Sequence, residues 1–124
     1  MKLTILGKIP SQKNNKQIAI NRRTGRRFVR SNDTVLAWQK DAKRQLQAQF
    51  EGYKITDYPI EVTIVFYRPN LIRRDLDNVA SGILDCMVAS EIIVDDDVNH
   101  VSMLTLSYGG VDKLNPRAEI FIED

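Results

Sequence analysis

Cysteine is almost absent from this sequence of 124 residues, where Cys86 is the only one. A single thiol excludes an intrachain disulfide and a zinc site built from several cysteines. Long apolar runs are missing as well: no stretch approaches the roughly 20 apolar residues that a membrane helix needs, and residues 1–15 lack the apolar core of a signal peptide. We therefore predict one domain, cytoplasmic and without membrane contact.

The net charge of +2 conceals a strong asymmetry along the chain. Residues 1–54 contain 13 Lys or Arg and 3 Asp or Glu, a net charge of +10, whereas residues 55–124 contain 5 and 13, a net charge of −8. Such a division suggests a nucleic-acid surface in the first half and a metal site in the second. The alternative is that the basic residues only solvate loops and helix surfaces.

Alternating apolar residues predict strands over 2–9, 60–67, 98–108 and 117–123. Two shorter β-prone pieces, 18–21 and 27–30, flank a Thr-Gly turn and predict a hairpin. Gly109 and Gly110 are expected to follow the end of the 98–108 strand, before a turn through Asn115 and Pro116.

Two helices are expected between these strands. The first runs over 34–50, with Ser31 or Asp33 as its N-cap and with Trp38 and Leu46 in the core. The second lies between two acidic groups, with Asp77 or Asn78 as its N-cap and with Cys86 inside it. The pattern as a whole predicts an α+β domain with a mixed sheet, two main helices and a basic hairpin.

Phosphate-binding side chains are concentrated before and within the predicted hairpin. Guanidinium groups bind phosphates through paired N–H donors, and asparagine and lysine also reach phosphate oxygens. The candidate DNA-binding residues of this region are Lys13, Asn14, Asn15, Lys16, Arg22, Arg23, Arg26 and Arg27.

Five carboxylates flank the second helix: Asp75 and Asp77 precede it, and the run 95–97 follows it. Asp75 and Asp77 share one face if the backbone there is extended. If the helix returns the second group beside the first, the carboxylates need a cation, and Mg²⁺ prefers such hard oxygen ligands. Arg73 and Arg74 beside them are further candidates for DNA contact. These features favour a metal-dependent nuclease, and the alternative is an acidic start that only stabilises the helix dipole.

Two other polar residues near these groups are weaker candidates. Asp85 lies inside the second helix, where it faces either the acidic groups or solvent. His100 follows the acidic run by three residues, and a lone histidine near a strand is more often structural than catalytic.

The sequence DLDN at 75–78, followed by a helix and by VDD at 94–96, resembles the RusA family of Holliday junction resolvases. These are small homodimeric endonucleases of bacterial, phage and prophage origin. The similarity extends to the first strand with its Pro and Asn-rich end, to the basic hairpin and to the Trp38 helix. The resemblance implies the same α+β fold, assembled as a homodimer.

The resemblance also implies roles for individual residues. It implies that Asp75, Asp77 and Asp96 are the catalytic carboxylates that hold Mg²⁺, for which Mn²⁺ is a possible substitute. The residues implied to lie beside these ligands are Asn78, Ser81, Asp85 and Asp95.

The chain departs from the family pattern at Ser81, where the family usually has lysine. A residue at i+4 on a helix lies above its predecessor, so a lysine there would direct a positive charge toward the site, which serine cannot supply. The implied function is Mg²⁺-dependent resolution of four-way DNA junctions by paired symmetric nicks in recombination and repair. The alternative is a junction- or branched-DNA-binding module with a weakened or lost nuclease site.

Overall fold

The structure, a computed structural model, describes residues 1–10, 16–31, 33–52, 54–71 and 76–123, without the side chains of 16–19, 29–31 and 76–78. The elements along the chain are β1 (Lys2–Leu6), β2 (Lys16–Ile20), β3 (Arg27–Ser31), α1 (Asp33–Phe50), β4 (Ile60–Arg68), α2 (Leu76–Ala89), β5 (Val101–Val111) and β6 (Arg117–Glu123). The predicted α+β fold with a mixed sheet, two helices and a hairpin is confirmed. In the part of the chain described, neither helix is long and apolar enough to cross a membrane.

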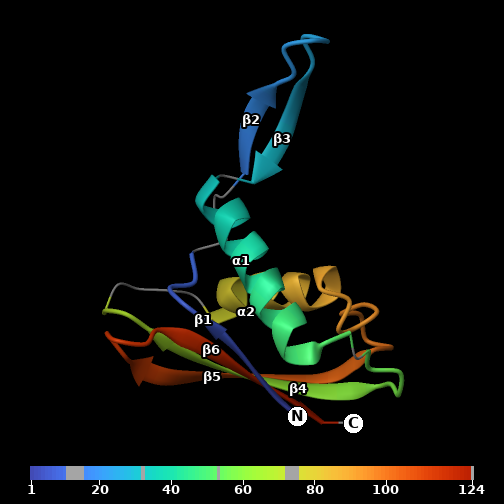
Figure 1. The fold of residues 1–124 in the computed structure, drawn as a ribbon, viewed down its shortest axis with the longest axis vertical. Coiled ribbons are helices and arrows are strands. Elements are labelled where there is room, and N and C mark those ends of the chain that lie inside the picture. Colours follow the sequence, from blue (N-terminus) through green and yellow to red (C-terminus); the bar gives the residue numbers. More distant parts are fainter. Residues whose placement is uncertain (11–15, 32, 53, 72–75, 124) are drawn as a thin grey trace.

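The main sheet has four strands in the order β1-β6-β4-β5, and both helices lie over one of its faces (Figure 1). β4 and β5 are parallel neighbours, whereas β6 pairs antiparallel with β1 and β4. Since a parallel connection must return to the starting end of the sheet, α2 carries the chain back across it. α2 therefore begins beyond the end of β4 and runs toward the end where β5 begins (Figure 1).

The core lies between the helices and the sheet. Along β4 the side chains of Val62, Ile64 and Phe66 are buried, as strand alternation predicts. Trp38 and Leu46 of α1 join the same cluster, which confirms their assignment to the core. Cys86 is also buried, and burial raises the pKa of its thiol to about 12, which suits a packing role rather than a reactive one.

Several predicted boundaries were wrong. β1 ends at Leu6 rather than at residue 9, because Gly7 has a positive φ of 106° that no strand continues. Ser31 is the last residue of β3 and Asp33 already belongs to α1, so neither is the predicted N-cap. Asp33 lies in the first turn of α1, where its negative charge interacts favourably with the helix dipole.

β5 also differs from its prediction at both ends. Residues 98–100 form a turn, closed by hydrogen bonds from the His100 and Val101 N–H groups to the Asp97 carbonyl at 3.1 and 2.8 Å. Gly109 and Gly110 continue the strand instead of ending it. A Cβ on Gly109 would lie 2.6 Å from the Tyr67 ring, so any larger residue there would require the ring to move.

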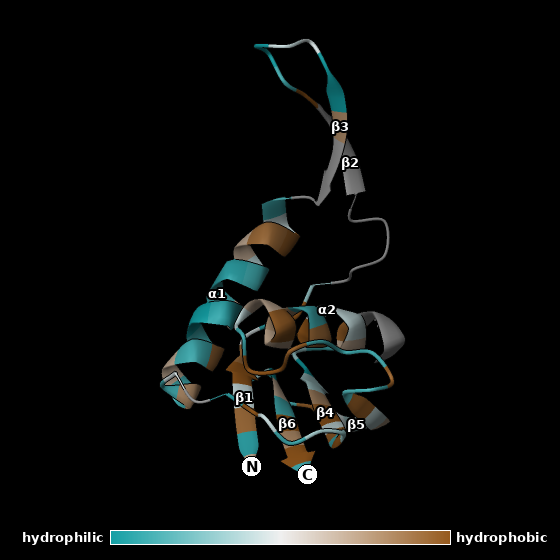
Figure 2. Cartoon of the chain, turned by 90° about the vertical axis from the view of Figure 1, so that its right-hand side faces the viewer, coloured by the Kyte–Doolittle hydropathy of each residue, from teal (hydrophilic) through white to brown (hydrophobic). Residues whose placement is uncertain are grey.

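β2 and β3 form the predicted hairpin, which projects away from the sheet beside the start of α1 (Figure 1). The Asn21 N–H donates to the Arg26 carbonyl at 2.8 Å, and the Gly25 N–H donates to the Asn21 carbonyl at 2.7 Å. Residues 20–28 are all exposed, and the turn is strongly hydrophilic (Figure 2). The arm, residues 16–31, therefore presents an ordered tip to solvent.

Candidate functional site

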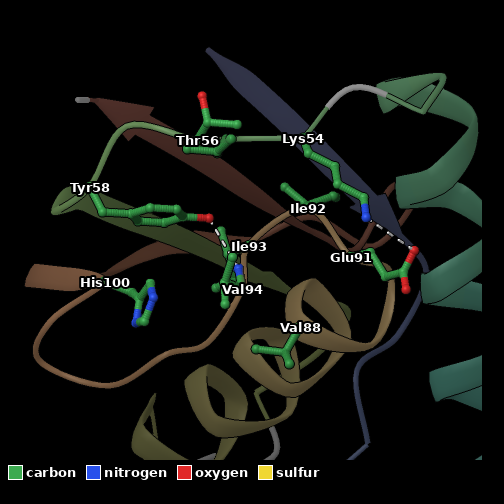
Figure 3. Close-up of a pocket in the computed structure, with 10 residues that line it drawn as sticks. Lys54, Thr56, Tyr58, Val88, Glu91, Ile92, Ile93, Val94 and His100 are labelled. Atoms are coloured by element: carbon green, nitrogen blue, oxygen red, sulfur yellow. Dashed lines mark hydrogen bonds and ion pairs between the residues drawn. The ribbon is translucent and has the colours of Figure 1, made fainter.

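The acidic run lies in a loop, residues 94–100, that Tyr58 contacts at both ends (Figure 3). The Val94 N–H donates to the Tyr58 hydroxyl at 3.0 Å, and the His100 ring packs edge-on against the Tyr58 ring with centroids 4.8 Å apart. We call residues 94–100 the acidic loop. Because both of its ends are fixed to one side chain, the carboxylates between them have a defined position.

The three carboxylates of the acidic loop have different partners. Oδ1 of Asp97 lies 2.6 Å from His100 Nδ1, which must carry the proton because a carboxylate only accepts, and Oδ1 also accepts from the backbone N–H of Asn99. The His100 hydrogen bond is the main reason why the pKa of Asp97 is lowered, and the Asn99 N–H contributes to the lowering. Oδ1 of Asp95 accepts from the Asp96 N–H at 2.8 Å.

Asp96 is the carboxylate that is left available. Asp96 is exposed, and no residue that the structure describes makes a hydrogen bond or ion pair with its side chain. Asp95 and Asp97 are committed to the geometry of the loop, whereas Asp96 is open to a cation from solvent. Three adjacent and chemically identical side chains thus differ in their hydrogen bonds, and only the Asp96 carboxylate has no described partner.

The first acidic group is described only in part. Asp75, Arg73 and Arg74 lie outside the described residues, and Asp77 and Asn78 are described by their backbone alone. Both lie in the first turn of α2, which begins at Leu76, so neither is its N-cap. The extended backbone that would place two aspartates on one face is therefore not present at Asp77.

Asp77 and the acidic loop lie toward opposite ends of α2 within one chain. The Ile55 N–H donates to the Ile92 carbonyl at 3.2 Å, so the segment after α2 lies beside the chain that enters β4. α2 begins beyond the other end of β4 and, with 14 residues, spans about 21 Å. The sequence interpretation supposed that the helix returns the acidic loop beside the start of α2. In the described elements of one chain the two lie apart. Among the described side chains, no group of three or more His, Cys, Asp or Glu could hold a metal ion.

Ser81 and Asp85 are both exposed on α2. They lie four and eight residues after Asp77, a spacing that places all three positions along one side of the helix. Ser81 is therefore positioned where a longer, charged side chain would extend toward the start of α2.

The structure describes only some of the residues of the predicted basic surface. Lys13, Asn14 and Asn15 lie outside the described residues, and Lys16 is described only as the first backbone position of β2. Four arginines stand exposed at the tip of the arm, and no acidic side chain that the structure describes pairs with them: Arg22, Arg23, Arg26 and Arg27.

Arginines on the body of the molecule differ in this respect. Arg117 forms ion pairs with Asp112 at 2.8 Å and with Glu119 at 3.6 Å, and it stacks over the Tyr67 ring. Arg44 is paired with Asp41 at 2.6 Å. Unlike Arg117 and Arg44, the guanidinium groups at the tip of the arm pair with no described carboxylate and are available to phosphates.

Comparison with known proteins gives the family of the chain. Residues 9–123 match the family model described as Endodeoxyribonuclease RusA. The chain belongs to the RusA endodeoxyribonuclease family. It is 33% identical to the crossover junction endodeoxyribonuclease RusA of Aquifex aeolicus (strain VF5) over 93 residues, which cover 75% of this chain and 70% of that protein. The family expected from the 75–78 and 94–96 motifs is confirmed.

The structure adds one residue to this candidate site that the sequence did not indicate. Tyr58 precedes Pro59 in a segment interpreted only as a loop, and no motif marks it. It lines a cavity of about 590 Å³ between the chain entering β4 and the segment after α2 (Figure 3). An ion pair of 3.8 Å between Lys54 and Glu91 lies at the other side of this cavity. Only the tertiary contact with the acidic loop reveals what Tyr58 does.

Proposed function

We propose that this RusA-family protein is a Mg²⁺-dependent endodeoxyribonuclease that resolves four-way DNA junctions by paired nicks, acting as a homodimer. The observation that carries the proposal is the acidic loop, in which Asp96 is exposed and uncommitted between two carboxylates bound to the loop itself. The crossover-junction activity in the name of the Aquifex relative supports the choice of substrate. The cytoplasm remains our prediction for where it acts.

The donor set fits a hard divalent cation. We propose that Asp75, Asp77 and Asp96 hold Mg²⁺, which prefers carboxylate oxygens, and that Mn²⁺ substitutes for it. When bound, Mg²⁺ would lower the pKa of a water molecule and neutralise charge on the scissile phosphate. The chain itself would supply the position of Asp96, which Tyr58 and His100 fix through the ends of the acidic loop.

The arm would supply most of the affinity for DNA. Its exposed guanidinium groups are positioned to bind phosphates, and such contacts carry little sequence information. Lys13, Asn14, Asn15, Lys16, Arg73 and Arg74 remain predicted DNA contacts on the basis of their residue types.

An immobile four-way junction, labelled in turn on each strand, tests the proposal. With Mg²⁺ we expect nicks at symmetric positions in two opposing strands, and with EDTA in place of Mg²⁺ we expect none. The matched control is a linear duplex of the same sequence. Equal cleavage of junction and duplex, or nicking that EDTA does not affect, would contradict the assignment. Binding without any cleavage would favour the DNA-binding module with a lost nuclease site.

Ser81→Lys is expected to accelerate junction nicking about tenfold or more, because it returns a positive charge to the side of α2 that carries Asp77. The control is Ala89→Lys, which adds the same charge at the exposed opposite end of the same helix. Single-turnover nicking rates at saturating protein separate the chemical step from tighter binding. Equal rate changes in both variants would show a general charge effect and no role for position 81.

A further inference from the structure

Phe28 is an exposed aromatic side chain on the arm. Of the four phenylalanines in the chain, Phe50 and Phe66 are buried in the core, and the Phe121 ring centroid lies 5.6 Å from the Lys2 ammonium. Phe28 is 46% exposed, and no residue that the structure describes makes a ring contact with it. Because the arm projects away from the sheet (Figure 1), packing against the core does not explain an aromatic residue at this position.

The side chains around Phe28 are basic. The arm is hydrophilic at its tip, where the four arginines have no described acidic partner (Figure 2). Arg27 directly precedes Phe28 in β3 and lies opposite Ile20 of β2. Since successive strand residues point to opposite faces, Arg27 and Ile20 share one face of the hairpin and Phe28 lies on the other. One face of the arm, close to the basic tip, therefore carries an exposed aromatic ring.

This combination is typical of surfaces that bind unpaired nucleic acid. A positively charged surface holds the phosphates, and aromatic side chains stack on bases of any sequence. Inside a continuous duplex both faces of each base are already stacked, so no base is open to a protein ring. At a branch point the stack is interrupted, and taking a base out of it costs least where that base is already unpaired.

We propose that Phe28 stacks on an unpaired base at a DNA branch point, while the arginines at the tip of the arm bind the phosphates beside it. The inference rests on the proposed function and narrows its substrate class. Phosphate contacts are the same on duplex and branched DNA, whereas the ring finds a partner only where a base is unpaired. Phe28 thus favours branched DNA over duplex, and a fork with single-stranded arms is a further ligand besides the four-way junction.

Substitutions at two exposed apolar positions of the arm test the stacking. Phe28→Leu keeps an apolar side chain and removes the ring, and Phe28→Tyr keeps the ring. Ile20→Ala is the matched control on the opposite face, where Ile20 is 59% exposed. All three changes are at exposed positions, so the chain is expected to keep its fold. Fluorescence anisotropy in EDTA measures binding to a four-way junction, to a fork with single-stranded arms and to a linear duplex.

Phe28→Leu is expected to weaken binding to the junction and to the fork about tenfold, and binding to the duplex less than about twofold. Phe28→Tyr and Ile20→Ala should bind all three DNAs like wild type. The slope of log affinity against log salt should not change in Phe28→Leu, because no phosphate contact is lost. Equal losses on all three DNAs, a shallower salt slope, or the same loss in Ile20→Ala would contradict the stacking.

Photo-crosslinking places the ring on the DNA. 5-Iododeoxyuridine, which crosslinks to an aromatic side chain stacked on it, is incorporated in turn at the branch point of the fork and inside its duplex. We expect the crosslinked peptide to contain Phe28 for the branch-point position alone. A crosslink from the duplex position only, or none at Phe28 from either position, would overturn the proposal.

The failures of the two proposals are distinguishable. A wild type that cleaves the junction, together with a Phe28→Leu variant that binds as tightly, overturns the stacking and leaves the nuclease function standing. A wild type that cleaves no junction overturns the function, and the fork measurements still decide the stacking. A Phe28→Leu variant with a smaller mass than wild type in sedimentation equilibrium would assign the ring to a contact between two copies and refute its role on DNA.

Discussion

Replacing Asp96 by asparagine is expected to reduce Mg²⁺-dependent junction nicking roughly 10²- to 10³-fold. The change keeps the size of the side chain and removes the charge that would hold the cation, in a carboxylate that no described residue engages. Junction affinity measured in EDTA should be unchanged or slightly higher, because a negative charge near the phosphates is lost. Nicking rates and binding curves on the same labelled junction provide both quantities.

Asp95→Asn and Asp97→Asn are the matched controls, since each removes one charge from the same run. The hydrogen bonds that Asp97 accepts from Asn99 and His100 can also be accepted by an asparagine carbonyl, so the loop should keep its shape. We expect the nicking rates of these two variants to fall about tenfold at most. Equal losses in all three variants would mean that the charge of the run matters and that Asp96 has no special role.

Replacing the four arginines at the tip of the arm by glutamine is expected to weaken junction binding roughly 10²-fold or more in moderate salt. The variant carries Arg22→Gln, Arg23→Gln, Arg26→Gln and Arg27→Gln, all at exposed positions without described acidic partners. Each lost phosphate contact releases one counterion fewer, so the slope of log affinity against log salt should become shallower by about 3.6. Fluorescence anisotropy over a salt series measures both effects.

A variant with the same change in net charge on the body of the molecule is the control. Lys8, Lys40, Lys43 and Lys113 are exposed and lie outside the arm, and their replacement by glutamine removes four charges as well. We expect a much smaller loss of affinity and a nearly unchanged salt slope, because these charges are not gathered on one projecting element. Similar losses in the two variants would show that net charge governs binding and that the arm has no specific part.

The order of the elements follows from the sequence because it depends on local periodicity. β4 was recognised by alternation and α1 by its apolar stripe, both of which record which side of an element is buried. Boundaries were less accurate where one backbone angle or one tertiary contact decides them. Gly109 illustrates this, since a glycine pair in sequence suggests the end of a strand, whereas here Gly109 lies inside β5 with the Tyr67 ring packed against it.

The sequence by itself determined the family, the charge division and the residue types of the site, because motifs and composition are properties of the chain alone. Only the tertiary structure decided which carboxylate of the acidic run is available, because hydrogen bonds from His100 and the backbone separate three identical side chains. It also decided that Asp77 and the acidic loop lie toward opposite ends of α2, since the parallel pairing of β4 and β5 fixes where the helix begins and ends. Parallel pairing joins residues far apart in the chain, and no local pattern records it.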